Sequence, residues 1–272
     1  MATTKNEYDR LLVEASHRVL LEVARLLYDY REGIVIVGGS VPGLILDQNS
    51  PKHIGSIDVD IALDQKTIQE VGYRSIMQLL SKRGYVQGDQ PFIFYRTLQV
   101  DKQEITVEVD FLAGEYGGTS KKHRTQAVQD MHPRKARACD LAFQQPIQIT
   151  IEGILPDGGK DRASIQVASI VPFLVMKAQA LNSRLKEKDA YDIYYCLTNF
   201  PDGMDALADV FRTFPDHPLI HEGLAILSEK FSASDSVGPV FVTNFLDEID
   251  PDTRALIQRD AYERVQYLLN AL

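Results

Sequence analysis

Apolar residues recur at helical spacing at the start of the chain and again through its second half. Between Glu7 and Tyr30 they form one face of an amphipathic helix. From Ser169 onwards the pattern is helical again, and the last helix has a clear start because Asp250 can cap it and Pro251 is favoured at its first position. The helices expected there are Val171–Leu185, Lys188–Leu197, Met204–Phe211, His217–Phe231 and Pro251–Leu272.

Strand patterns lie between these helical regions. Ile57–Leu63 and Ile105–Leu112 alternate apolar and polar residues, which predicts strands with one polar face. Ile34–Val37 is a β-branched run typical of a buried strand, and Gly38, Gly39 and Ser40 follow it. Further strands are expected at Phe92–Leu98, Ile147–Ile151 and Ala163–Val167, and helices at Pro42–Leu46 and Thr67–Lys82.

The order of these elements predicts an α+β fold in two parts. Residues 1–168 form a mixed β-sheet with flanking helices, and residues 169–272 form a C-terminal α-helical domain. The length of 272 residues and the 44% hydrophobic content are sufficient for a sizeable core.

Composition excludes several classes of protein. Two distant cysteines favour neither a disulfide framework nor a zinc site. The N-terminal residues lack the apolar core of a signal peptide, and no stretch is long enough to span a membrane, so we expect a cytoplasmic protein. A net charge of −9 argues against a protein that coats nucleic acid.

One segment departs from this acidic balance. Lys121–Arg137 carries six Lys or Arg against the single acid Asp130. Charge runs are usually solvated surface, and the alternative is a contact surface for a triphosphate or for RNA.

Three carboxylates are the strongest candidates for chemistry. Asp58 and Asp60 are two apart on a predicted strand, so both side chains leave the same face. Like charges this close raise one another's pKa unless a cation intervenes. If the strand that carries Asp110 pairs with the first one, Asp110 completes a set of oxygen ligands suited to Mg²⁺.

The glycine turn makes this pattern more specific. Gly38, Gly39 and Ser40 lie between a strand and a helix, where backbone amides can hold phosphate oxygens. The glycine spacing does not fit the GxGxxG pattern of dinucleotide-binding folds, and neither Lys52 nor Lys160 has the flanking residues of a Walker A motif.

Gly39, Ser40, Asp58, Asp60 and Asp110 together resemble the nucleotidyltransferase superfamily related to polymerase β. The helical stretch PFLVMKAQALNSRLKEKDAYDIYYCL (residues 172–197) narrows the likeness, because it looks like the corresponding segment of the AbiEii/AbiGii toxin family. The residues that carry this second likeness are Lys177, Arg184, Lys188, Asp189 and Asp192.

The resemblance implies a nucleotidyltransferase-type fold and a metal-dependent transfer of a nucleotide from a nucleoside triphosphate (NTP). Asp58 and Asp60 would bind two Mg²⁺ ions, and Asp110 would join one of them and deprotonate the acceptor hydroxyl. The other nucleotide-binding candidates are Gly38, Gly39, Ser40, Lys177 and Arg184, with Lys177 on the pyrophosphate. Asp192, or else Asp189, would position Lys177 or the acceptor. The helical domain would complete the active site.

Family members are toxins of toxin-antitoxin or phage-defence systems, so the resemblance implies an RNA acceptor, especially tRNA, and a cognate antitoxin.

Two alternatives to this function stay open. One is transfer to a small molecule such as an antibiotic, and the other is a catalytically silent module that binds a nucleotide or a partner protein. For Lys188 and Asp192 the plain alternative is an ordinary i,i+4 ion pair.

Overall fold

The computed structural model describes residues 4–46, 51–68, 75–115, 125 and 128–272. It confirms a mixed α/β fold, with a central mixed sheet and a helical C-terminal region. The chain divides into two compact units. The sheet unit contains residues 9–44 and 55–169, and the helical unit contains residues 1–8, 45–54 and 170–272.

The sheet of the first unit has the strand order β3-β4-β5-β2-β1-β8-β7, and β6 pairs with β5. All the expected strands are confirmed, with bounds that differ by a few residues, whereas β3 and β6 were not expected. The strands are β1 (Ile34–Val37), β2 (Val59–Leu63), β3 (Val86–Gln87), β4 (Ile93–Val100), β5 (Gln103–Ala113), β6 (Arg134–Lys135), β7 (Ile147–Ile154) and β8 (Lys160–Val167).

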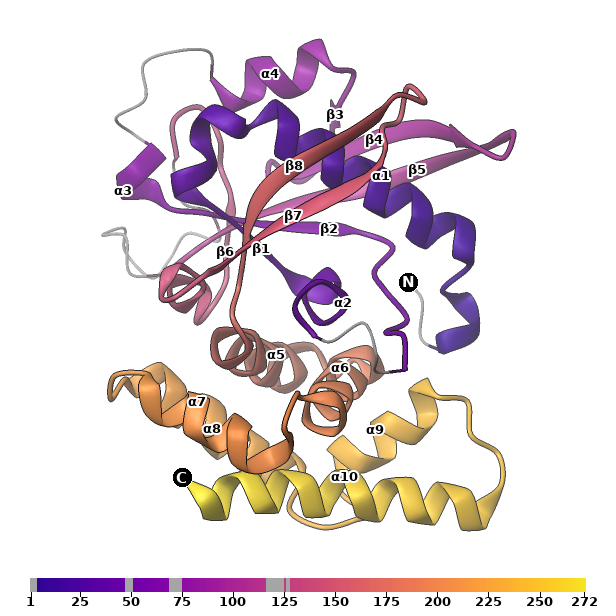
Figure 1. Cartoon of the computed structure of the whole chain (residues 1–272), viewed down its shortest axis with the longest axis vertical. Helices are drawn as coiled ribbons and strands as arrows, with labels where there is room; N and C mark the ends of the chain where they lie inside the picture. Colours follow the sequence, from indigo (N-terminus) through magenta and orange to yellow (C-terminus); the bar gives the residue numbers. More distant parts are fainter. Residues whose placement is uncertain (1–3, 47–50, 69–74, 116–124, 126–127) are drawn as a thin grey trace. The chain divides into compact units, whose positions relative to one another are not determined.

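Helix α1 (Arg10–Leu26) lies across one face of this sheet (Figure 1). Its apolar stripe, which includes Val19, Leu20 and Val23, is almost completely buried. Burial of such a stripe is the main source of stability for a helix of this kind.

A single helix over Thr67–Lys82 was expected, and this prediction is wrong. The structure has α3 (Gln65–Ile68) and α4 (Ile76–Lys82), and residues 69–74 lie outside the described part. Ser75 has an extended backbone, and its hydroxyl accepts a hydrogen bond from Gln78 N at 3.2 Å. A serine cap of this kind starts a new helix rather than continuing one. In the described part of the N-terminal half there is one more α-helix, α2 (Val41–Ile45), and the 3-10 helices are Lys5–Glu7, Tyr28–Gly33, Gly38–Ser40 and Cys139–Phe143.

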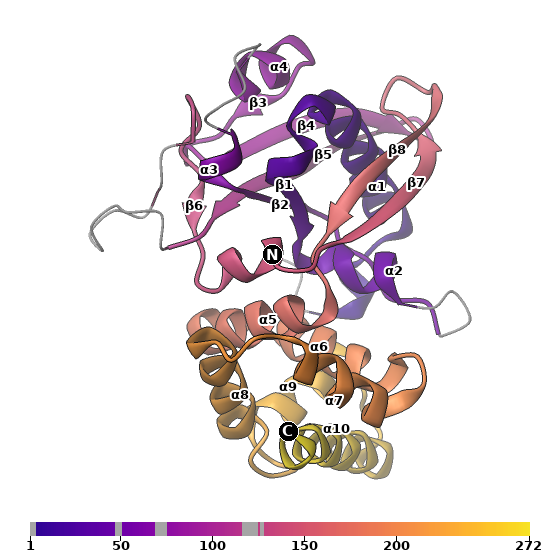
Figure 2. The same ribbon diagram turned by 60° about the vertical axis from the view of Figure 1, so that its left-hand side comes forward.

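The second unit is built from helices (Figure 2). The expected helices are confirmed within a few residues at each end, and the Asp250 cap accepts from Thr253 N at 2.8 Å as the sequence indicated. The helices are α5 (Ile170–Arg184), α6 (Glu187–Asn199), α7 (Gly203–Thr213), α8 (Pro218–Lys230), α9 (Val237–Phe245) and α10 (Pro251–Ala271). None of the helices in the described ranges is both long and apolar enough to cross a membrane.

Helix α9 was not expected, because Gly238, Pro239 and its β-branched residues have low helix propensity. The proline is tolerated because it lies in the first turn. Packing then favours the helix, since Val242 and Phe245 are fully buried and Gly238 lies against the ring of Phe231.

Candidate functional site

The sheet register brings two of the three predicted carboxylates together. β2 pairs in parallel with β5, and Asp60 and Asp110 are direct Cα partners. Partners on neighbouring strands project from the same face about 5 Å apart. The expectation that the strand of Asp110 lies beside the strand of Asp60 is therefore confirmed.

Asp58 lies one residue before β2 rather than inside the strand that was expected from Ile57. Its position is fixed by two hydroxyl groups. Ser56 Oγ donates to the Asp58 carboxylate, and Ser16 Oγ of α1 donates to the Asp58 carbonyl oxygen at 2.9 Å. These two bonds hold the backbone and the carboxylate of Asp58 at the start of β2.

Asp110 is the most enclosed member of the set. Its side chain is 11% exposed, and Arg134 of β6 donates to Oδ2 at 2.6 Å. Burial raises the pKa of Asp110 to about 6, against the opposing effect of Arg134, and the charges of Glu108 and Asp58 add to the increase. The second oxygen, Oδ1, is buried and has no hydrogen-bond partner among the described residues.

The pKa of Asp110 predicts how the stability of the metal-free protein depends on pH. The folded state favours the protonated acid, because the pKa is above its ordinary value of 3.8. Ionisation of Asp110 should therefore lower stability by up to about 3 kcal/mol as pH rises from about 4 to about 6. Urea unfolding of the wild type and of Asp110→Asn, with a chelator, should show the stability of the wild type falling relative to the variant over this range. A constant difference between the two would contradict the assignment.

The glycine turn lies directly beside Asp60. β1 pairs antiparallel with β2, and Val37 is the Cα partner of Asp60. Gly38 follows with φ +72°, and a Cβ at this position would lie 1.8 Å from Asp60 Oδ2. Only glycine fits here, so the backbone of the turn and the carboxylate are in close contact. Gly39 is buried, and Ser40 is half-buried.

Gly38→Ala should therefore be more destabilising than the same change at Gly158, a glycine of the same unit with φ +90° and no atom within 4 Å of its built Cβ. At Gly158 the free energy of unfolding should fall by about 1–2 kcal/mol, which is the cost of the left-handed backbone for a residue with a side chain. At Gly38 the displaced Asp60 carboxylate should add roughly 1–3 kcal/mol. Urea unfolding monitored by circular dichroism measures both, and equal losses would contradict the close approach.

These groups fit a divalent cation by their chemistry. Carboxylate oxygens are the ligands that Mg²⁺ prefers, and the open Oδ1 of Asp110 is a buried oxygen that a cation would satisfy. In the described ranges, no group of three or more His, Cys, Asp or Glu side chains is arranged so that it could hold a metal ion.

The helical unit holds the second set of predicted residues. Lys177 of α5 is 7% exposed, and its Nζ lies 2.9 Å from Asp189 Oδ1 and 2.7 Å from Asp192 Oδ2, both on α6. Arg184 binds Asp189 with two nitrogens, each at 2.7 Å. Both acids therefore contact Lys177, and the sequence had left open which one does.

In this network each buried charged group is kept ionised by the opposite charges beside it. Burial alone would lower the pKa of Lys177, but Asp189 and Asp192 raise it above its ordinary value. Burial alone would raise the pKa of Asp192, but Lys177 and Lys188 keep it far below its ordinary value. The i,i+4 pair of Lys188 and Asp192 is confirmed, but it is buried rather than exposed.

His53 is a member of this network that the sequence did not indicate. Its Nε2 lies 2.9 Å from Asp192 Oδ1, and its ring stacks on Tyr191 with centroids 5.6 Å apart. Tyr195 donates a hydrogen bond to the carbonyl oxygen of Pro51 at 2.6 Å, so the segment before Gly55 is fastened to α6. Burial, followed by the charge of Lys188, lowers the pKa of His53, which favours the neutral ring. A lone histidine in a loop gives no signal from which these contacts could be predicted.

Part of the basic segment Lys121–Arg137 falls on residues 121–124 and 126–127, which lie outside the described residues. In the part that is described, Arg134 pairs with Asp110, and Arg137 pairs with Glu115 at 2.9 Å. The sequence predicted a charged surface here, but it did not indicate that Arg134 reaches a carboxylate of the candidate site.

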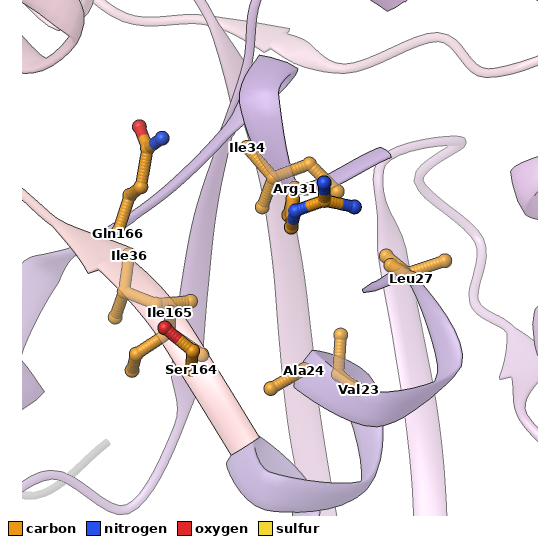
Figure 3. Close-up of a pocket in the computed structure, with 9 residues that line it drawn as sticks. All are labelled: Val23, Ala24, Leu27, Arg31, Ile34, Ile36, Ser164, Ile165 and Gln166. Atoms are coloured by element: carbon orange, nitrogen blue, oxygen red, sulfur yellow. The ribbon is translucent and has the colours of Figure 1, made fainter. Parts of the chain in front are cut away.

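A small apolar pocket lies elsewhere in the sheet unit, between the end of α1, β1 and β8 (Figure 3). The residues that line it include Leu27, Arg31, Ile34 and Ile165. Its volume of about 20 Å³ is close to that of one water molecule. None of the predicted site residues lines this pocket, so it is not a candidate for the nucleotide.

Comparison with models of known protein families identifies a match. The model of a family described as nucleotidyl transferase AbiEii toxin, Type IV toxin-antitoxin system, matches residues 56–264. Asp58, Asp60 and Asp110 lie inside this range, as do Lys177 and Asp192, and the glycine turn lies before it. No curated protein and no solved structure matches the chain.

Proposed function

Because the chain belongs to the AbiEii nucleotidyl transferase toxin family of Type IV toxin-antitoxin systems, we propose that it transfers a nucleotide from an NTP to RNA, with tRNA as the first candidate acceptor. The reaction depends on Mg²⁺. The observation that carries this proposal is the register of Asp60 and Asp110 on adjacent strands, with the Gly38 turn against Asp60.

The candidate residues of the sheet unit have two proposed roles, metal binding and phosphate binding. Asp58, Asp60 and Asp110 hold Mg²⁺, and the bound ions supply neutralisation of charge on the triphosphate and on the attacking oxygen. The backbone amides of Gly38 and Gly39, together with the Ser40 hydroxyl, bind phosphate oxygens.

In the transfer step an acceptor hydroxyl attacks the α-phosphorus, a new P–O bond forms, and the bond to the pyrophosphate oxygen breaks. Asp110 takes the proton of the hydroxyl.

For the helical unit we propose that Lys177 binds the leaving pyrophosphate and that Asp192 positions it. The 2.7 Å contact between Lys177 Nζ and Asp192 Oδ2 supports the second part. Arg184, which is 42% exposed and anchored on Asp189, is the further candidate for a phosphate contact. A cognate antitoxin is the proposed partner of the toxin.

The test is incubation of the purified protein with each α-labelled NTP, Mg²⁺ and total RNA. We expect label in RNA, and above all in the tRNA fraction. Label in an added aminoglycoside instead would favour a small-molecule acceptor. Tight NTP binding without transfer to either acceptor would favour the silent module.

A further inference from the structure

Arg134 connects the basic segment to the candidate metal site. β6 pairs in parallel with β5, with Leu112 and Arg134 as Cα partners. From there the guanidinium reaches Asp110 Oδ2 at 2.6 Å, and it lies 5.9 Å from the centroid of the Phe92 ring. The strand order places the Gly38 turn on one side of the two carboxylates and Arg134 on the other.

The ion pair compensates a buried charge. A carboxylate as enclosed as Asp110 is costly to ionise without a cation beside it, and Arg134 is that cation in this structure. A divalent ion bound by Asp110 would provide the same compensation. It would also weaken the hold of Asp110 on Arg134, because two cations then share one carboxylate.

The guanidinium of Arg134 can form further hydrogen bonds. The Arg134 side chain is 36% exposed, and its guanidinium has five N–H donors, of which the bond to Asp110 uses one. Among the described residues, no second hydrogen-bond acceptor for Arg134 is found. Arginine binds phosphate through two parallel hydrogen bonds, a geometry that the compact ammonium of lysine cannot reproduce.

We propose that Arg134 is a triphosphate ligand that Asp110 holds in place before the metal binds, and that in the loaded site the guanidinium exchanges its hydrogen bond to Asp110 for hydrogen bonds to the NTP phosphates. This inference rests on the proposed function, because it requires a metal at Asp110. It gives Arg134 a specific role in nucleotide binding.

The test uses the full chain, with Mn²⁺ and inorganic tripolyphosphate as probes, so that the preferred base need not be known. Isothermal titration at pH 8 compares the wild type with Arg134→Gln and Arg134→Lys. Arg137→Gln is the matched control, because it removes the same charge from a surface pair with Glu115. Circular dichroism establishes that each variant is folded.

For Arg134→Gln we expect tighter binding of Mn²⁺ alone, since the competing cation is gone. We also expect binding of tripolyphosphate with Mn²⁺ to weaken by about 10- to 100-fold, the effect of losing hydrogen bonds to a charged group. Arg134→Lys should keep the Mn²⁺ affinity of the wild type but bind tripolyphosphate more weakly. The control should behave as the wild type.

Two results would overturn the proposal about Arg134. One is unchanged tripolyphosphate binding in both Arg134 variants, and the other is an equal loss in Arg137→Gln, which would indicate a general charge effect. Failure of the proposed function itself looks different, because the wild type would then bind no Mn²⁺ even with tripolyphosphate present.

Discussion

Replacing Asp58 and Asp60 together with Asn is expected to reduce nucleotide transfer by about 10³-fold or more while the fold is retained. The two carboxylates are the proposed ligands of metal ions whose charge stabilisation is worth several kcal/mol, and each 1.36 kcal/mol corresponds to a tenfold change in rate. Asn keeps the shape of the side chain but removes the charge. Initial rates of label transfer at saturating Mg²⁺ measure the effect.

The matched control for this variant is Asp89→Asn with Glu104→Gln, which removes two negative charges from exposed positions of the same unit. It should transfer label at the rate of the wild type. Circular dichroism and the urea midpoint should be similar for all three proteins. Retention of more than about a tenth of the rate in the Asp58 and Asp60 variant would contradict a metal site at these residues.

Asp192→Ala is expected to have the largest effect on stability. Its carboxylate is fully buried and lies against the ammonium groups of Lys177 and Lys188 and the neutral ring of His53, so its removal takes one compensating negative charge away from two buried cations. Breaking a buried pair in this way costs about 3–5 kcal/mol. The chain contains no Trp, so urea unfolding is best followed by circular dichroism.

The matched control is Asp209→Ala in α7, whose partner is Arg212 and whose side chain is 74% exposed. An exposed pair contributes only about 0–1 kcal/mol, and the variant should unfold close to the wild type. A loss below about 1 kcal/mol in Asp192→Ala would mean that the network does not stabilise the helical unit.

The same network has a defined pH dependence. The folded pKa values of Asp189 and Asp192 are below their ordinary values, so their stabilisation is present above the unfolded pKa and is lost as pH falls. The pKa of Lys177 is raised, so its contribution is lost only at strongly alkaline pH. Asp192→Ala should therefore remove part of the acid sensitivity of the wild type.

Local sequence patterns were sufficient to predict much of the fold and the central carboxylates of the candidate site. The alternation around Asp60 and Asp110 predicted two strands with acidic faces, because a period of two follows directly from strand geometry. The buried strand before Gly38 was also readable from its β-branched residues. These features depend on residues close together in the chain.

The parts that were missed depend on contacts between distant residues. Arg134 meets Asp110 only because β6 joins the sheet beside β5, and nothing in a basic run indicates which acid it will pair with. His53 meets Asp192 across 139 positions of the chain. Helix α9 forms against its own propensity because tertiary packing outweighs it.

The most direct test of the central claim is a crystal structure of the wild-type protein with Mn²⁺ and tripolyphosphate, recorded with the anomalous signal of manganese. The account predicts an anomalous peak within roughly 2.0–2.3 Å of carboxylate oxygens of Asp60 and Asp110, with Asp58 on the same cluster and phosphate oxygens at the Gly38 turn. Well-ordered Asp60 and Asp110 with no anomalous peak between them, while tripolyphosphate is bound elsewhere, would contradict it.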